Sequence, residues 1–231
     1  MKKFVFLFAI LSIQVNYAQD FTQFWLRATL LYAINPKLSS SIELHHRTES
    51  FHNTESPFRY PLTNAFRLWL VYKLSDHETI NFSPYAFFSN YPQINKEQDV
   101  LNSNVNEHRV HLQYENKLRT GKAWSLNSRF GGEYRIFENN QDLFRLRFRE
   151  ALSFSVTKKI NVQVYDELFL NTMNVDKNHV FDQNRIGIVT NYILSDKFRI
   201  ELGITHIQSM PRNGSVIMNN LMFQTNWSYS L

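Results

Sequence analysis

Hydrophobic and polar residues alternate along most of the chain, in short segments that polar turns interrupt. In residues 143–154, LFRLRFREALSF, three arginines stand at every second position, with leucine or phenylalanine between them. A period of two is typical of a β-strand, because successive side chains point to opposite faces. Each such segment therefore predicts a strand with one apolar face and one polar face.

One local pattern occurs five times: an alternating segment, a short polar turn and a second alternating segment. The last apolar residues before the turns, which follow one another at intervals of 40, 44, 38 and 38, are Ile34, Leu74, Leu118, Val156 and Leu194. Alternating segments joined by a few turn residues predict β-hairpins. Five hairpins give ten strands, and the alternating tail IMNNLMFQTNWSYSL gives an eleventh.

The polar connectors between the hairpins are mostly longer than the turns within them. They cover 50–61, 90–106, 139–142, 173–182 and 209–215. Outer-membrane barrels have short periplasmic turns, longer outer loops and normally an even number of strands. We therefore predict an all-β fold, a transmembrane antiparallel up-and-down β-barrel of ten to twelve strands.

The chain begins with the layout of a secretory signal. Lys2 and Lys3 precede an apolar run of about ten residues, which is too short to span a bilayer as a helix. We expect cleavage after Ala18, which leaves 19–231 as a single barrel domain in the outer membrane of a Gram-negative bacterium. A short membrane anchor at 1–18 is the alternative.

Composition narrows the choice of partners. The absence of cysteine excludes a lipoprotein signal, disulfides and thiolate metal sites. Removal of Lys2 and Lys3 lowers the formal net charge from +5 to +3, too little to suggest nucleic acid. We expect outer-membrane lipid around the protein, the barrel-assembly machinery as a partner during insertion, and no cofactor or metal; the sequence indicates no other protein partner.

A soluble periplasmic β-sandwich that binds a ligand would also alternate, with its apolar faces packed in a core. Two features favour the barrel. The polar faces carry arginine and glutamate, which suit the interior of a narrow barrel. Tyrosine also stands two residues before three of the turns, at Tyr32, Tyr72 and Tyr192, where a membrane-interface girdle belongs.

Closing the hairpins pairs the inward charges across neighbouring strands. Turn lengths predict Arg149 opposite Glu167 and Arg109 opposite Glu133, with Arg147 one register step from Glu133 and Arg185 within reach of Glu167. The whole predicted lumen charge network is Arg109, Glu133, Arg135, Arg145, Arg147, Arg149, Glu167 and Arg185. It is either an anion-selective constriction or a charge-paired plug that holds a small barrel rigid, and the small bore favours the plug.

Glu150 and Asp166 are predicted to pair on the apolar face, which is costly near the middle of a bilayer. Two adjacent carboxylates could bind a cation or act as acid and base, and His206, also on the apolar side, could add a general base. A bulge, or a wall that rises above the membrane, explains them without chemistry, and we favour that explanation. No local motif identifies a nucleophile, so no catalytic triad is assigned.

Several segments follow one another in the order of a known family of exported barrel proteins. They are EHRVHLQYENKL, SRFGGEYRIF, RLRFREALSF, VYDELFLN and FDQNRIGIVTNYILSDKFRIELGITH. The chain resembles, over essentially its whole mature length, the family catalogued as domain of unknown function 2490. The glycine that usually follows the FDQNR strand in this family is less clearly matched here. The resemblance implies an outer-membrane barrel and no assigned activity.

The leading hypothesis for function is a non-enzymatic, porin-like barrel that acts as a narrow pore or a structural wall protein. The alternative from another class is a barrel enzyme that modifies lipid, similar to outer-membrane phospholipases and deacylases, with Glu150, Asp166 and His206 as candidate catalytic residues. The soluble sandwich is the weaker alternative.

Overall fold

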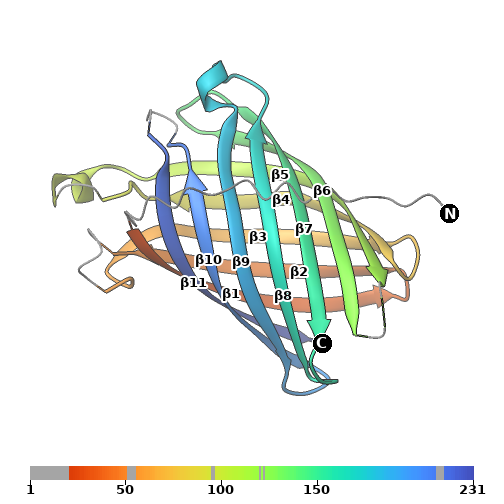
Figure 1. The fold of residues 1–231 in the computed structure, drawn as a ribbon. Helices are drawn as coiled ribbons and strands as arrows, with labels where there is room; N and C mark the ends of the chain where they lie inside the picture. The colour runs from red at the N-terminus through yellow and green to blue at the C-terminus, as the bar shows by residue number, and fades with distance from the viewer. Residues whose placement is uncertain (1–20, 51–55, 95–96, 120, 122, 212–215) are drawn as a thin grey trace.

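The computed structural model describes residues 21–50, 56–94, 97–119, 121, 123–211 and 216–231. The predicted signal peptide, 1–18, lies outside the described residues. Eleven strands form a closed barrel (Figure 1). The strands are β1 (Phe21–Asn35), β2 (Leu38–Glu49), β3 (Tyr60–Lys73), β4 (Glu78–Asn90), β5 (Val105–Arg119), β6 (Trp124–Phe137), β7 (Leu143–Ser155), β8 (Ile160–Asn171), β9 (Phe181–Ile193), β10 (Phe198–Ser209) and β11 (Met218–Ser230).

The five predicted hairpins and the eleventh strand are all confirmed. Each strand pairs antiparallel with its neighbour in the sequence, and β1 pairs in parallel with β11, from Phe21 opposite Asn220 to Leu31 opposite Ser230. An up-and-down barrel with an odd number of strands needs one such parallel seam, because its first and last strands run in the same direction. The strand count is therefore within the predicted range, although the even number that is usual for bacterial barrels does not hold.

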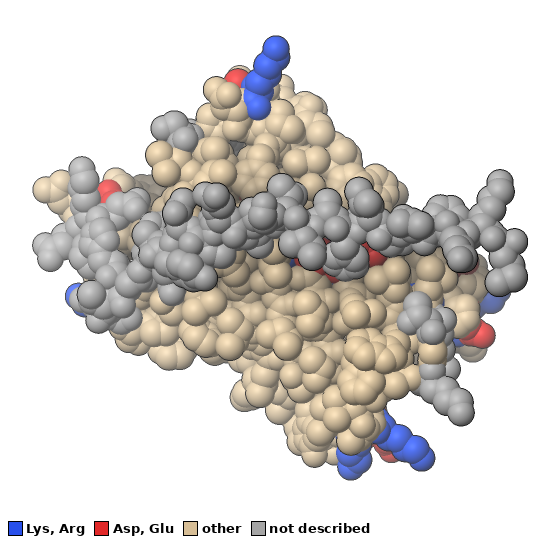
Figure 2. Space-filling model, viewed as in Figure 1, with Lys and Arg blue, Asp and Glu red and all other residues tan. Residues whose placement is uncertain are grey.

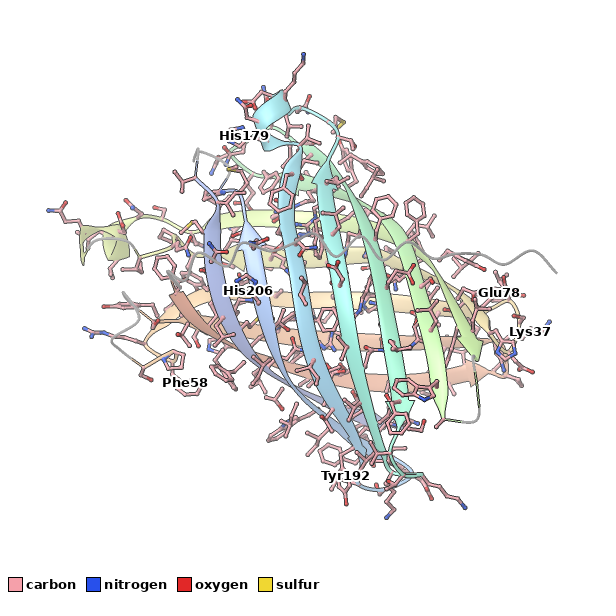
Figure 3. All side chains as sticks on the ribbon, viewed as in Figure 1. Lys37, Phe58, Glu78, His179, Tyr192 and His206 are labelled. Carbon is pink, nitrogen blue, oxygen red and sulfur yellow. The ribbon has the colours of Figure 1, made fainter. Side chains whose placement is uncertain are left out.

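The two ends of the barrel differ in their connections, as predicted. The turns within hairpins, such as 36–37 and 156–159, lie at one end. The longer connections lie at the other, with described residues 50, 56–59, 91–94, 97–104, 138–142, 172–180, 210–211 and 216–217. Figure 3 labels Lys37, Glu78 and Tyr192 at the turn end and Phe58 and His179 at the loop end. Because the seam is parallel, β1 starts at the loop end and β11 ends at the turn end.

Two short 3-10 helices, η1 (Glu97–Leu101) and η2 (Lys177–His179), lie in the loops. Neither of these helices, the two in the described part of the chain, has the length or apolarity of a membrane span.

The outer wall is apolar and the interior is polar. The face of the barrel in Figure 2 is mainly free of charged groups, and Lys and Arg stand out at its ends. Large apolar side chains such as Leu112 and Leu202 are more than half exposed on the wall. Among the described residues, 20 buried side chains are polar or charged and 12 are hydrophobic. This inverted distribution suits lipid outside and excludes the soluble sandwich, whose apolar faces would be covered.

Aromatic side chains gather near the turn end of the outer wall. Tyr32, Tyr72 and Tyr192 are exposed there, as the sequence predicts for an interface girdle. Trp124 and Phe154 join them as a cross-strand pair, with ring centroids 4.5 Å apart.

Gly131 on β6 lies where the neighbouring strand leaves no room for a side chain. A Cβ atom there would lie 2.7 Å from Gln113 Cβ, 2.8 Å from His111 Nε2 and 2.9 Å from the Leu112 carbonyl oxygen. Gly131→Val should therefore lower the free energy of unfolding in urea by about 1–3 kcal/mol. Gly121→Val provides the control, because a Cβ atom added at Gly121 would meet no atom within 4 Å. Equal stability of the two variants would contradict this packing.

Candidate functional site

The lumen contains a cavity of about 590 Å³, and side chains from all eleven strands line it. Its charged lining is strongly unequal in sign. Ten arginines line the cavity, namely Arg27, Arg47, Arg67, Arg109, Arg129, Arg135, Arg145, Arg147, Arg149 and Arg185. Four carboxylates line it, namely Glu43, Glu167, Asp182 and Glu201. The surface of the cavity is therefore positively charged.

Glu133 on β6 is fully buried and binds three arginines from three other strands. Its Oε1 accepts hydrogen bonds from Arg67 Nη2 and Arg109 Nη1, both at 3.2 Å, and its Oε2 accepts from Arg145 Nε at 3.0 Å. Arg145 also donates to Asp182 Oδ2 at 2.7 Å. Arg67 lies on β3, so this contact reaches over β4 and β5 and ties distant parts of the wall together.

Glu107 on β5 is the second buried acceptor. Arg109 Nε and Arg135 Nε donate to its Oε1 at 2.7 and 2.5 Å, and their Nη2 atoms donate to its Oε2 at 2.9 and 3.1 Å. Asn90 Nδ2 adds a further hydrogen bond at 3.1 Å. Glu107 thus neutralises two guanidinium groups that face each other across the β5–β6 pair.

The predicted register of this hairpin is wrong by two residues. Leu118 pairs with Leu126 and not with Trp124, so Arg109 lies opposite Arg135, while Glu133 lies opposite His111. A register shift of two residues does not change the face of the sheet to which a side chain points, so every inward residue stays inward. Arg109 still reaches Glu133 diagonally, because its side chain is long.

The hairpin β7–β8 has the predicted register. Arg149 lies opposite Glu167, and Arg185 on β9 lies opposite the same carboxylate. The ion pair to Glu167, however, comes from Arg147 Nη2 at 2.8 Å. Arg149 Nη2 instead donates to Gln163 Oε1 at 2.9 Å, while Arg185 Nε donates to Gln183 Oε1 at 3.3 Å. The structure therefore assigns Arg147 to Glu167 and not to Glu133, which binds Arg145.

Several interior arginines also lie over aromatic rings. The guanidinium carbon of Arg109 is 3.7 Å from the Phe88 centroid, and that of Arg149 is 3.9 Å from the Tyr165 centroid. The guanidinium carbons of three arginines, Arg145, Arg147 and Arg185, lie 4.7–5.0 Å from the centroid of the Phe169 ring. Cation–π contacts of this kind hold a guanidinium group against the wall and strengthen as water is excluded.

Of the charged residues that line the cavity, the predicted network lacked Arg27, Glu43, Arg47, Arg67, Arg129, Asp182 and Glu201, and it also lacked the buried Glu107. The alternation that placed Arg109 inward also places Glu107 inward, two residues earlier, so that signal was present. For Arg67 the polar face was recognised, but its contact with Glu133 depends on the curvature of the barrel. Nothing in the local sequence indicates which strands meet across the lumen.

Residues of the loop after β4 narrow the outer mouth of the lumen. Ile94 is buried at 4% exposure, and its backbone N–H donates to Glu49 Oε1 at 3.1 Å. Tyr91 N–H donates to the Leu62 carbonyl at 3.0 Å, which holds the start of the loop on β3. Gln93 lines the cavity. The segment 91–94 therefore partly covers the loop end.

Glu150 and Asp166 lie opposite each other on the outer wall, as predicted. The β7–β8 pairing has no register shift at this point, so of the two favoured explanations the bulge is wrong, and a wall that rises above the membrane stays a prediction. Each carboxylate has its own neutral donor, Ser128 Oγ to Glu150 at 2.7 Å and Asn184 Nδ2 to Asp166 at 2.6 Å. These bonds reduce the cost of two carboxylates in the middle of their strands.

His206 on β10 does not join these carboxylates. His206, labelled in Figure 3, lies opposite Ile186, and Ile186 in turn lies opposite Asp166. Three strand spacings, about 14 Å, separate the backbones at His206 and Glu150. The three candidate catalytic residues therefore do not form a hydrogen-bonded set.

A family model described as protein of unknown function (DUF2490) matches residues 22–217. The chain belongs to this family. No curated protein matches it. This member of the family folds as a closed β-barrel with an apolar outer wall.

Three solved barrels are similar to the chain. The NanC porin has 10% sequence identity and a TM-score of 0.48, over 90% of this chain and 99% of that one. An anion-selective porin from Comamonas acidovorans has 8% identity and a TM-score of 0.37, over 81% and 55%. The outer-membrane expressed OmpT of Vibrio cholerae has 7% identity and a TM-score of 0.38, over 78% and 58%. Scores this low carry no argument about function.

Removal of the Glu133 carboxylate should destabilise the barrel strongly. Glu133→Gln removes the negative charge that three buried guanidinium groups share and leaves Arg67 without its carboxylate, so we expect a loss of about 3–5 kcal/mol in the free energy of unfolding in urea. Glu115→Gln is the matched control, because its ion pair with Arg129 is about a third exposed and a surface pair contributes about 0–1 kcal/mol. A similar loss in both variants would contradict the structural role of the Glu133 cluster, formed by Glu133, Arg67, Arg109 and Arg145.

Proposed function

We propose that the protein is a narrow pore of the outer membrane that passes small anions in preference to cations. The observation that carries this proposal is the lining of the lumen, with ten arginines against four carboxylates. Three further carboxylates are buried behind this surface, at Glu49, Glu107 and Glu133, and Glu115 binds Arg129; the ten arginines still outnumber all eight carboxylates. A lumen lined by one sign of charge concentrates ions of the opposite sign.

The size of the cavity supports a small cargo. A volume of about 590 Å³ lies in the range of small-molecule sites, roughly 300–1,000 Å³. The ion pairs tie long side chains to their neighbours around this space, which favours an open lumen over a charge-paired plug. The segment 91–94 restricts entry from the loop end, which favours ions and small solutes over folded or polymeric cargo.

The outer wall supports the location. Exposed leucine, isoleucine and phenylalanine cover the middle of the strands, and tyrosine and tryptophan lie towards the turn end. This pattern favours a bilayer around the barrel, with the short turns in the periplasm and the loops outside. A Gram-negative outer membrane provides that setting.

Planar-bilayer recording on the refolded protein tests the proposal. In a KCl gradient, we expect single-channel steps and a reversal potential that shows higher permeability for chloride than for potassium. The triple variant Arg47→Gln, Arg149→Gln, Arg185→Gln should lose most of this preference, because it removes the lumen guanidinium groups that no carboxylate of the described residues binds. The control removes three exposed turn lysines, Lys158, Lys159 and Lys197, and should keep it.

Two results would contradict the proposal. A reversal potential that favours potassium would show that the lining does not set the selectivity. The absence of steps in every preparation that is folded, as judged by heat-modifiable mobility on a gel, would leave only the role of a structural wall protein.

A further inference from the structure

In the part of the chain that the structure describes, seven of the ten arginines that line the cavity bind a carboxylate, and three do not. The pairs run from Arg27 to Glu201, from Arg67, Arg109 and Arg145 to Glu133, from Arg129 to Glu115, from Arg135 to Glu107 and from Arg147 to Glu167. Within the described residues, Arg47, Arg149 and Arg185 make no ion pair.

The hydrogen-bond partners of these three arginines are neutral or missing among the residues described. Arg149 and Arg185 donate to glutamine side chains. Arg47 Nε is buried and finds no partner in the described ranges. All three side chains are partly exposed to the cavity, where the other seven arginines each have a carboxylate to balance their charge. Three guanidinium groups with unused charge therefore point to a negatively charged ligand that the described chain does not itself supply.

The three arginines face one region of the lumen. The guanidinium carbons of Arg47 and Arg185 are 4.6 and 5.8 Å from the centroid of the Trp25 ring, so they are at most 10.4 Å apart. Arg149 and Arg185 flank Glu167 on the two neighbouring strands. All three line the same cavity.

Nearby carboxylates do not neutralise this region. Glu167 accepts from Arg147. Glu49, two residues after Arg47 on β2, accepts from the backbone N–H of Ile94, and it forms no ion pair with Arg47 within the described part of the chain. The region therefore keeps its positive charge.

We infer that Arg47, Arg149 and Arg185 form a binding station, inside the lumen, for a small oxyanion that carries two or more negative charges. This inference rests on the proposed anion pore and specifies its ligand class. Chloride can balance one guanidinium group, whereas phosphate or carboxylate oxygens accept hydrogen bonds from two arginines at once. Trp25 and Tyr165 lie against the guanidinium groups of Arg47 and Arg149, and apart from the bonds that Arg149 and Arg185 donate to glutamines, their N–H groups are available for the ligand.

A station of this kind would make the pore select among anions. A pore conducts when its sites bind strongly enough to admit the ion and weakly enough to release it. Chloride would then pass freely, and a polyvalent oxyanion would enter, remain longer at the three arginines and interrupt the chloride current.

Block of the chloride current by inorganic pyrophosphate tests the inference. With the refolded full-length mature protein in a planar bilayer, added pyrophosphate should reduce the chloride current in a concentration-dependent manner. Arg47→Gln with Arg185→Gln should raise the half-blocking concentration by about tenfold or more, because two charge-assisted contacts are lost. Arg129→Gln, which removes a lumen arginine that has its own carboxylate, is the matched control and should change it by less than about twofold.

The outcomes separate this inference from the proposed function. An anion-selective current that pyrophosphate does not block, or that it blocks equally in the double variant and in wild type, would overturn the station and leave the pore. Equal loss of block in Arg129→Gln would also overturn it, since general lumen charge would then suffice.

If no current is found, or if the double variant does not fold, a second measurement tests the inference. Pyrophosphate should raise the Tm of the detergent-solubilised wild-type protein and raise it less in the single variant Arg149→Gln. Wild-type protein whose Tm does not respond to pyrophosphate would overturn the station independently of conduction.

Discussion

A wall that stands in lipid has to satisfy every backbone N–H and C=O group within the protein, because an unpaired group in hydrocarbon costs several kcal/mol. The parallel seam between β1 and β11 meets this requirement for an odd number of strands. Closure also makes the lumen narrow. Every second side chain of every strand then enters one confined space, where residues from distant strands meet, as Arg67 of β3 and Glu133 of β6 do.

Because the lumen is narrow, the positive charges of the inward arginines lie close together and have to be balanced. Most of them are balanced by buried carboxylates, above all Glu107 and Glu133, each of which serves more than one guanidinium group. Such pairs fix the arrangement of the wall more than they increase its stability, since desolvation offsets much of the attraction. In the proposed pore, the positive charge that remains at Arg47, Arg149 and Arg185 would give the lumen its preference among ions.

Alternation along the sequence was sufficient to predict the hairpins, the eleventh strand and the inward or outward direction of every candidate residue. Turn length was not sufficient for register, since Leu118 pairs two residues further along β6 than predicted. Which arginine takes a given carboxylate also escaped prediction, because long side chains reach diagonally: Glu167 lies opposite Arg149 but binds Arg147. The contact of Arg67 with Glu133 depends on barrel curvature, which no local pattern encodes.

The central claim is that the positions of LFRLRFREALSF alternate between a water-filled lumen and lipid. Because the chain has no cysteine, single substitutions can report each position to a water-soluble, membrane-impermeant thiol reagent. In lipid vesicles, Arg147→Cys and Arg149→Cys should react, whereas Leu146→Cys and Phe148→Cys should be protected. Uniform reactivity along the strand, or reaction at 146 and 148 with protection at 147 and 149, would contradict the account.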